Sequence, residues 1–274
     1  MYAPRIRLFM LAAVFAAVSA VTGFAQAQKE PPTVRDFCVK VIPGKNAEFE
    51  AYIHDTAVPL NQSRADAGEI AWFLVVRGVI PAGTSAKCDY RIAYGYKGLP
   101  PEPLSDAQID AALKRAQINL SAKELAAKRD SLSQLVDVGI WSQIEAIGAS
   151  TEKGNYIRLN HYSVKPGEWE NWTHLETTYW KPMVEAWLKS GGKGSWGVYG
   201  QMMPEGDNVP YNALTVDIFS DWNSLVHGVP FATWQKVHPN TDATDVFDRL
   251  DRVRSRHDIE IYKVLEVTAP AKSN

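Results

Sequence analysis

A glutamate stands within a run of aromatic residues in the C-terminal half of the chain. The aromatic and methionine side chains recur there at three- and four-residue spacing, which places them on one face of a helix. They are Trp169, Trp172, Tyr179, Trp180, Met183 and Trp187. Glu176 falls on the same face. Burial among indole rings raises the pKa of a carboxyl group, so Glu176 is a candidate general acid or base.

Polar partners for this carboxylate come from the segment 156–165, which has the composition of a β-strand. Alternation along a strand puts Arg158, Asn160 and Tyr162 on one face. We expect Asn160 to lie near Glu176 in a polar pocket between strand and helix. Two alternatives stay open: Arg158 forms a salt bridge that keeps Glu176 ionised, or Glu176 reaches water at a helix edge, since unpaired glutamate is rarely buried.

The same pattern of strand, Pro-Gly turn and helix is written earlier in the chain. KVIPGKNAEF at 40–49 matches SVKPGEWENW at 163–172, and in the same register Pro81 and Gly83 match Pro204 and Gly206. This self-similarity indicates a duplication. The first copy has Phe37 and Ile53 where the second has Asn160 and Glu176. We therefore predict that the first copy fills with hydrocarbon the volume that the second leaves polar.

Each copy is expected to fold as strand, helix, two strands, helix and strand. The expected strands are 34–42, 70–80, 87–96 and 136–146 in the first copy, and 156–165, 194–203, 211–219 and 258–267 in the second. Such a unit forms a four-stranded antiparallel sheet with its helices on one face. The bare face must be covered. We predict an α+β fold of two tandem ferredoxin-like repeats packed sheet to sheet; two domains without sheet contact are the alternative.

Several stretches resemble a known superfamily. The VKPG turn at 164–167, the WKP at 180–182 and GSWGVYG at 194–200 are similar to secreted bacterial members of the dimeric α/β-barrel superfamily. That superfamily includes antibiotic-biosynthesis monooxygenases, NIPSNAP-like proteins and EthD-like proteins. The resemblance covers nearly all of the chain after its N-terminal segment, and it implies an intramolecular barrel. It does not imply one activity, because this fold hosts many.

The resemblance also raises a haem alternative. In haem-degrading members, an asparagine on the first strand, a tryptophan in or after the third strand and a histidine on the second helix form the site. Asn160 and Trp222 stand at corresponding places in the second copy. His227 follows Trp222 more closely than that pattern requires, which counts against haem ligation. We expect no cofactor, with haem bound through His227 as the alternative.

The N-terminal segment has the layout of a signal peptide. Arg5 and Arg7 precede the apolar run LFMLAAVFAAVSAV, and Ala25-Gln26-Ala27 offers a cleavage site. We predict a signal peptide over 1–27, a first repeat over 28–149, a second over 150–268 and a tail over 269–274. The mature protein is then periplasmic or extracellular without stable membrane association; a retained N-terminal anchor is the alternative.

Charge and cysteine content narrow the partners and the compartment. A formal net charge of −2 provides no basic field for nucleic acid. Cys38 and Cys88 are the only two cysteines. They fall on the expected first and third strands, which are neighbours in a ferredoxin-like sheet. Export favours a disulfide between them, and two unpaired buried thiols are the alternative.

These observations favour an exported protein that binds a small apolar or aromatic molecule in the second repeat. The residues expected to contact that molecule are Arg158, Tyr162, Trp172, Tyr179, Trp180 and Trp222. One alternative is a cofactor-independent monooxygenase or isomerase that moves a proton with Glu176 and Asn160. Another is a non-catalytic structural or partner-binding module. The sequence does not decide self-association.

Overall fold

The computed structural model describes residues 30–206 and 209–270. The expected signal peptide and most of the expected tail lie outside these described residues. Within 30–206 and 209–270, no helix combines the length and the apolar character that a membrane span requires.

The first half of the chain follows the expected order of elements. Its strands are β1 (Thr33–Val41), β2 (Trp72–Ile80), β3 (Tyr90–Tyr96) and β4 (Ser133–Gly148). Its helices are α1 (Asn46–Tyr52), α2 (Val58–Asp66), α3 (Asp106–Arg115) and α4 (Ala122–Asp130), with a π-helical turn at Ile53–Ala57 and a 3-10 turn at Gly83–Ser85.

The second half repeats this order. Its strands are β5 (Tyr156–Val164), β6 (Gly194–Met203), β7 (Ala213–Phe219) and β8 (Arg254–Thr268). Its helices are α5 (Trp169–Leu175), α6 (Lys181–Lys189), α7 (Trp222–His227), α8 (Phe231–Val237) and α9 (Ala243–Val253), with a π-helical turn at Glu176–Trp180. Both Pro-Gly turns place their glycine at positive φ, 84° for Gly44 and 79° for Gly167, where other residues are strained.

The eight strands close into one antiparallel barrel in the order β1-β3-β2-β8-β5-β7-β6-β4. Each half supplies four adjacent strands, and the seams are the pairs β2–β8 and β4–β6. Closure depends on the last strand of each half, since β4 has 16 residues and β8 has 15. Their later residues extend past their own sheet to pair with the other half. The predicted α+β barrel is confirmed, and the alternative of two domains without sheet contact is wrong.

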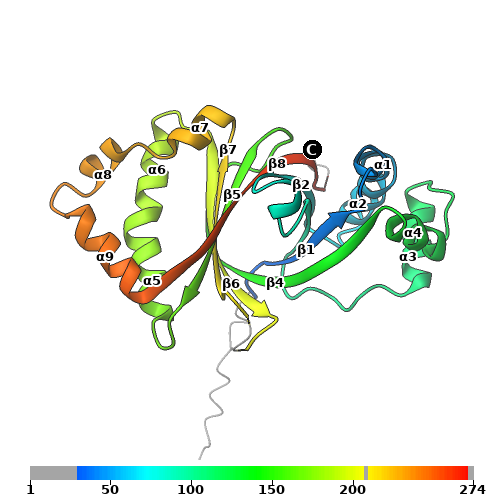
Figure 1. The fold of residues 1–274 in the computed structure, drawn as a ribbon, viewed down its shortest axis with the longest axis horizontal. Coiled ribbons are helices and arrows are strands. Elements are labelled where there is room, and N and C mark those ends of the chain that lie inside the picture. The colour runs from blue at the N-terminus through cyan, green and yellow to red at the C-terminus, as the bar shows by residue number, and fades with distance from the viewer. Residues whose placement is uncertain (1–29, 207–208, 271–274) are drawn as a thin grey trace, which may run out of the picture.

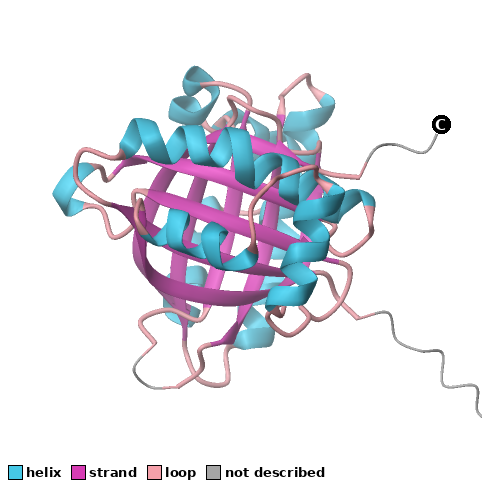
Figure 2. Cartoon of the chain, turned by 90° about the vertical axis from the view of Figure 1, so that its right-hand side faces the viewer, coloured by secondary structure: helices cyan, strands magenta, loops and turns pink. Residues whose placement is uncertain are grey.

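Helices cover the barrel on two opposite sides (Figure 1). α1 to α4 lie outside the first four strands, and α5, α6, α8 and α9 lie outside the last four. A view turned by 90° shows one set of helices in front of the curved strands (Figure 2). The barrel wall therefore has an outer face packed on helices and an inner face that borders the lumen.

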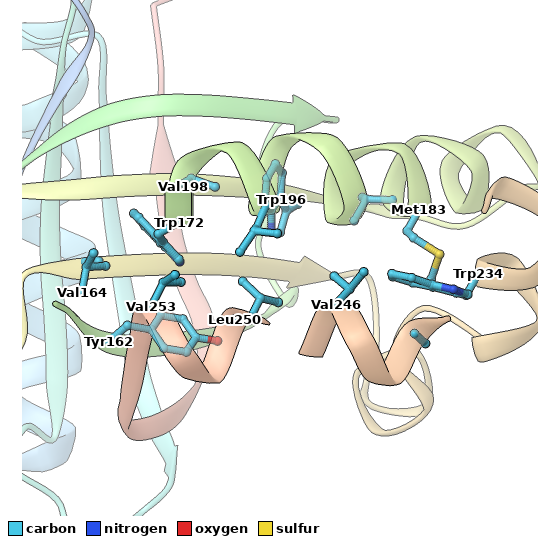
Figure 3. Packing of buried hydrophobic residues seen from close by; sticks show 14 residues of the cluster. Tyr162, Val164, Trp172, Met183, Trp196, Val198, Trp234, Val246, Leu250 and Val253 are labelled. Carbon is cyan, nitrogen blue, oxygen red and sulfur yellow. The ribbon is translucent and has the colours of Figure 1, made fainter. Parts of the chain in front are cut away.

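The described residues form four apolar clusters. The smallest packs Leu60 of α2 against Ala112 and Leu113 of α3, and the other three follow from this layering. One lies between the first half's strands and helices and includes Val39, Phe49 and Phe73. A second lies between the strands and helices of the second half, where Trp172 and Trp196 are central (Figure 3). The third fills part of the lumen with residues from both halves. This last cluster has no helix in it, because each half covers the inner face of the other.

Cys38 and Cys88 are joined by a disulfide, with their Cα atoms 5.2 Å apart. Cys38 lies on β1, and Cys88 lies two residues before the start of β3, the strand that pairs with β1. The predicted pairing is confirmed, and the alternative of two free thiols is wrong.

Candidate functional site

A cavity of about 440 Å³ lies in the lumen of the barrel, lined by residues from all eight strands. Its walls are mainly aliphatic and aromatic. The aliphatic side chains include Leu74, Leu214 and Val216, and the aromatic ones include Trp72, Trp141 and Tyr199. Burial raises the pKa of the Tyr199 hydroxyl to about 12, so this group stays neutral.

The mouth of the cavity lies where the first half passes into the second. Ala149 and Ser150, which follow β4, are exposed and also line the cavity, so the cavity meets solvent there. Trp72 borders the same region, and the position of its indole ring requires a glycine at position 95. A Cβ atom on Gly95 would lie 2.1 Å from Cε2 of Trp72, far inside van der Waals contact. The indole thus occupies space that any other residue at position 95 would fill.

A charged group lies on the cavity wall at Arg91 and Asp36. The guanidinium of Arg91 bonds Asp36, donates to Glu260 Oε2 at 2.7 Å from Nη2, and donates to the Tyr262 hydroxyl at 3.0 Å from Nε. Asp36 comes from the first half and Glu260 from the second. The lumen therefore combines an apolar chamber with an ionic group that both halves build.

Glu176 is buried, with 3 % of its surface exposed. The alternative in which Glu176 reaches water at a helix edge is therefore wrong. It begins the π-helical turn between α5 and α6. Its ionic partner is Arg254, the first residue of β8, whose guanidinium also lies 3.7 Å from the ring centre of Tyr162. Burial raises the pKa of the Glu176 carboxyl, and Arg254 opposes that shift.

The proposed salt bridge between Arg158 and Glu176 is also wrong. Arg158 Nε instead donates to Asp217 Oδ2 at 3.1 Å. The reason is register: Asp217 on β7 stands directly across from Arg158 on β5. Asn160 Nδ2 donates to the same carboxylate at 2.8 Å and to Thr215 Oγ1 at 3.0 Å. The side-chain amide of Asn160 therefore hydrogen-bonds to β7, whereas the carboxylate of Glu176 bonds Arg254.

Sequence reasoning missed Thr215, Asp217 and Arg254 in this polar layer. A signal for two of them was present, because alternate residues on the expected strand 211–219 share one face. The matching residues of the first half are Ile92 and Tyr94, so polar residues replace less polar ones on β7 as well as on β5. Arg254 carried no such signal, since it stands at the junction of a helix and a strand.

The predicted aromatic contacts are mostly core packing. Trp172 is fully buried in the helix-facing cluster (Figure 3). Tyr179 and Trp180 pack against that cluster. Tyr179 stacks on Trp234 with ring centres 6.2 Å apart. Trp222 is 42 % exposed and packs edge-on against Tyr156. None of the residues predicted to contact a ligand lines the 440 Å³ cavity.

The residues of the haem alternative do not fit haem ligation. His227 is exposed at the last residue of α7, and Asn160 already bonds β7. His238 lies within 2.9 Å of the Tyr179 carbonyl oxygen through Nε2. Among the described residues, no group of three or more His, Cys, Asp or Glu side chains is placed to hold a metal ion.

Comparison with known proteins gives a likeness of fold. No protein-family model and no curated protein matches the sequence. Candidate monooxygenases from Fusobacterium nucleatum and Lactobacillus acidophilus superpose with TM-scores of 0.57 and 0.56 at 10 % and 11 % identity. Each match covers 88 % of this chain, and 95 % and 97 % of the other chain. An anthrone oxidase-like protein has a TM-score of 0.50 at 10 % identity, over 89 % of this chain and 95 % of its own.

These solved structures belong to the ferredoxin-like, dimeric α/β-barrel class, and the present chain has their fold. At such low sequence identity the likeness extends to the fold alone. The chemistry of this chain has to be argued from its own cavity and side chains.

Proposed function

We propose that this protein binds a small, largely apolar molecule in the lumen of its barrel. The observation that carries the proposal is the cavity of about 440 Å³. This volume falls within the range of about 300–1,000 Å³ that is typical of small-molecule sites. The proposed site differs from the sequence-based one: it lies inside the barrel and uses both halves, whereas the expected pocket lay between sheet and helix in the second half.

The cavity walls favour an apolar occupant. Protein interiors are close-packed, and an empty apolar space forfeits dispersion contacts on every side. A ligand that fills the chamber restores those contacts and gains about 25 cal/mol for each Å² of apolar surface removed from water. The exposed rim at Ala149 and Ser150 supplies an entry path.

We also propose that the protein works outside the cytoplasm. Two independent features support this: the signal-peptide pattern over 1–27, and the Cys38–Cys88 disulfide, a bond that is rare in reducing compartments. An exported ligand-binding role is consistent with both.

The test is binding of N-phenyl-1-naphthylamine, a neutral aromatic probe whose fluorescence rises in apolar surroundings. We expect saturable binding by the wild-type protein. Ala93→Phe should weaken binding by at least about tenfold, because Ala93 lines the cavity and an added ring removes volume. Val136→Phe, an exposed position on β4, is the matched control and should bind as wild type. A folded Ala93→Phe protein with unchanged binding would contradict the proposal.

Catalysis without a cofactor is the second candidate function. It is favoured by one observation, the buried carboxylate of Glu176 within a π-helical turn, a distortion that is frequent at functional sites. Glu176 and Asn160 do not line the lumen cavity, so in this candidate Glu176 moves a proton of a molecule bound separately, between sheet and helix, and Asn160 assists it. Glu176→Gln would then abolish turnover while binding of the naphthylamine probe survives. A Soret band that His227→Ala removes would instead favour the haem alternative.

A further inference from the structure

The charged group in the lumen lies at the inner end of the cavity. β1 runs antiparallel to β4, so residues later in β1 are farther from the mouth at the end of β4. Asp36 therefore lies deeper than Val34, and both line the cavity. Beyond Asp36 and Arg91 the lumen narrows to a space of about 10 Å³. This inner end is the floor of the cavity.

The floor carries one unmatched negative charge. Asp36 and Glu260 both bond the guanidinium of Arg91. Within the part of the chain that is described, no second cation bonds either carboxylate. Burial raises the pKa of both neighbouring phenols, Tyr211 and Tyr262, so they stay neutral and add no compensating charge. Both carboxylates are largely shielded from water, with 14 % and 7 % of their side chains exposed.

Nearby charged groups are already paired with one another. Lys87 Nζ lies 2.6 Å from Asp137 Oδ2. His161, which faces the lumen, bonds Asp258. Neither group is free to neutralise the floor, and a buried charge without a partner is costly.

One oxygen of Asp36 is available to a ligand. Its Oδ2 accepts from Arg91, while its Oδ1 accepts no hydrogen bond from any residue within 30–206 or 209–270. A carboxylate oxygen accepts a hydrogen bond strongly from a charged donor. Trp141 also lines this region of the cavity, and aromatic ring faces attract cations. The floor thus offers a cationic group three things: the Oδ1 atom of Asp36 as a hydrogen-bond acceptor, an unmatched negative charge, and the aromatic surface of Trp141.

We propose that the ligand is an apolar or aromatic amine whose ammonium group binds Asp36 at the floor of the cavity, a step that rests on the proposed ligand-binding function. The hydrocarbon part then fills the apolar chamber toward the mouth. The ammonium group supplies the positive charge that Arg91 alone does not provide. A carboxylate in the same place would add a further negative charge beside Asp36 and Glu260.

The test compares three ligands of one shape by isothermal titration calorimetry at neutral pH: 1-naphthylmethylamine, 1-naphthalenemethanol and 1-naphthaleneacetate. The amine is protonated, the alcohol neutral and the acetate anionic. We expect the amine to bind about tenfold or more tightly than the alcohol, and the acetate to bind more weakly than the alcohol. Asp36→Asn should remove most of the preference for the amine, while Asp130→Asn, an exposed charge at the end of α4, should leave it unchanged.

The possible outcomes distinguish a failure of the amine preference from a failure of ligand binding itself. Equal binding of the three ligands, or tighter binding of the acetate, overturns the inference and leaves ligand binding in place. A preference for the amine that persists in a folded Asp36→Asn protein overturns the role of Asp36. If N-phenyl-1-naphthylamine and all three ligands fail to bind, the proposed function itself is overturned. The comparison of ligands uses the wild-type protein, so it stands even if a variant fails to fold.

Discussion

At the scale of single residues, the two halves differ at the first position of their π-helical turns. Ile53 is buried among apolar side chains in the first half, and Glu176 is buried against Arg254 in the second. A buried ion pair stabilises a fold weakly compared with a packed apolar pair, but removing one partner leaves a buried charge unpaired. The pair Glu176–Arg254 should therefore be strongly coupled.

A double-mutant cycle measures that coupling. Glu176→Ile and Arg254→Met should each lower the free energy of unfolding by about 3 kcal/mol, because each strands the other charge. The double variant should lose much less than the sum of the two, since it replaces the pair by hydrocarbon. Urea denaturation provides the values. The half-exposed pair Glu145–Lys181 is the control and should show coupling of about 1 kcal/mol or less; additive losses at Glu176 and Arg254 would refute the argument.

At the scale of elements, β8 is joined to β5 by more than its ladder. Asp258 on β8 bonds His161 on β5 and its own neighbour His257. Burial acts to raise the pKa of the Asp258 carboxyl, but the two histidines outweigh it and the pKa is lowered overall. A lowered pKa in the folded state means that the ionised carboxylate stabilises the strand pair. This contribution is present above the ordinary aspartate pKa and is lost as pH falls through the folded value.

Acid unfolding tests this link between β5 and β8. The urea midpoint of the wild-type protein should fall as the pH drops below about 4, the ordinary aspartate value. Asp258→Asn should be less stable at neutral pH and should show a shallower decline over that range, because its side chain does not titrate. Asp130→Asn should follow the wild-type curve. An Asp258→Asn protein with the wild-type slope would show that Asp258 does not carry the acid sensitivity.

At the scale of the whole molecule, closure of the barrel makes the two halves one cooperative unit. Each half ends in an unpaired edge until β2 meets β8 and β4 meets β6, and an open edge with a bare sheet face is unstable in water. The lumen cluster draws residues from both halves and loses its cover if either opens. Loss of one half should therefore unfold the other.

Hydrogen exchange during urea titration tests this cooperativity. β3 is central in the first half and β7 is central in the second. Their backbone amides should show the same free energy of opening, and that free energy should fall equally steeply with urea concentration. Far-ultraviolet circular dichroism and tryptophan fluorescence should give one coincident transition. Two transitions, with β3 and β7 opening separately, would contradict the single unit and weaken the proposed shared cavity.

Local patterns were sufficient to predict much of this architecture. The Pro-Gly turns, the period of the helices and the alternation along β1 and β5 depend on neighbours in the chain, so they can be read directly. The same alternation puts His161 on the opposite face of β5 from Asn160, and His161 stacks there on Tyr211 with ring centres 4.3 Å apart. Comparison of the two copies also indicated that Glu176 is buried, because it occupies the position equivalent to the buried Ile53.

Partners distant in sequence were not predictable in the same way. Arg254 reaches Glu176 across 78 positions, and Arg91 reaches Glu260 across 169. No periodicity relates such residues, because their distance is set by strand register and by the way the seams close. The lumen is a property of closure as well: its volume is the space left when eight strands of particular tilt and side-chain size meet. Sequence pattern therefore established the repeated unit and its buried faces, whereas folding in three dimensions established which charges meet and where a ligand has room.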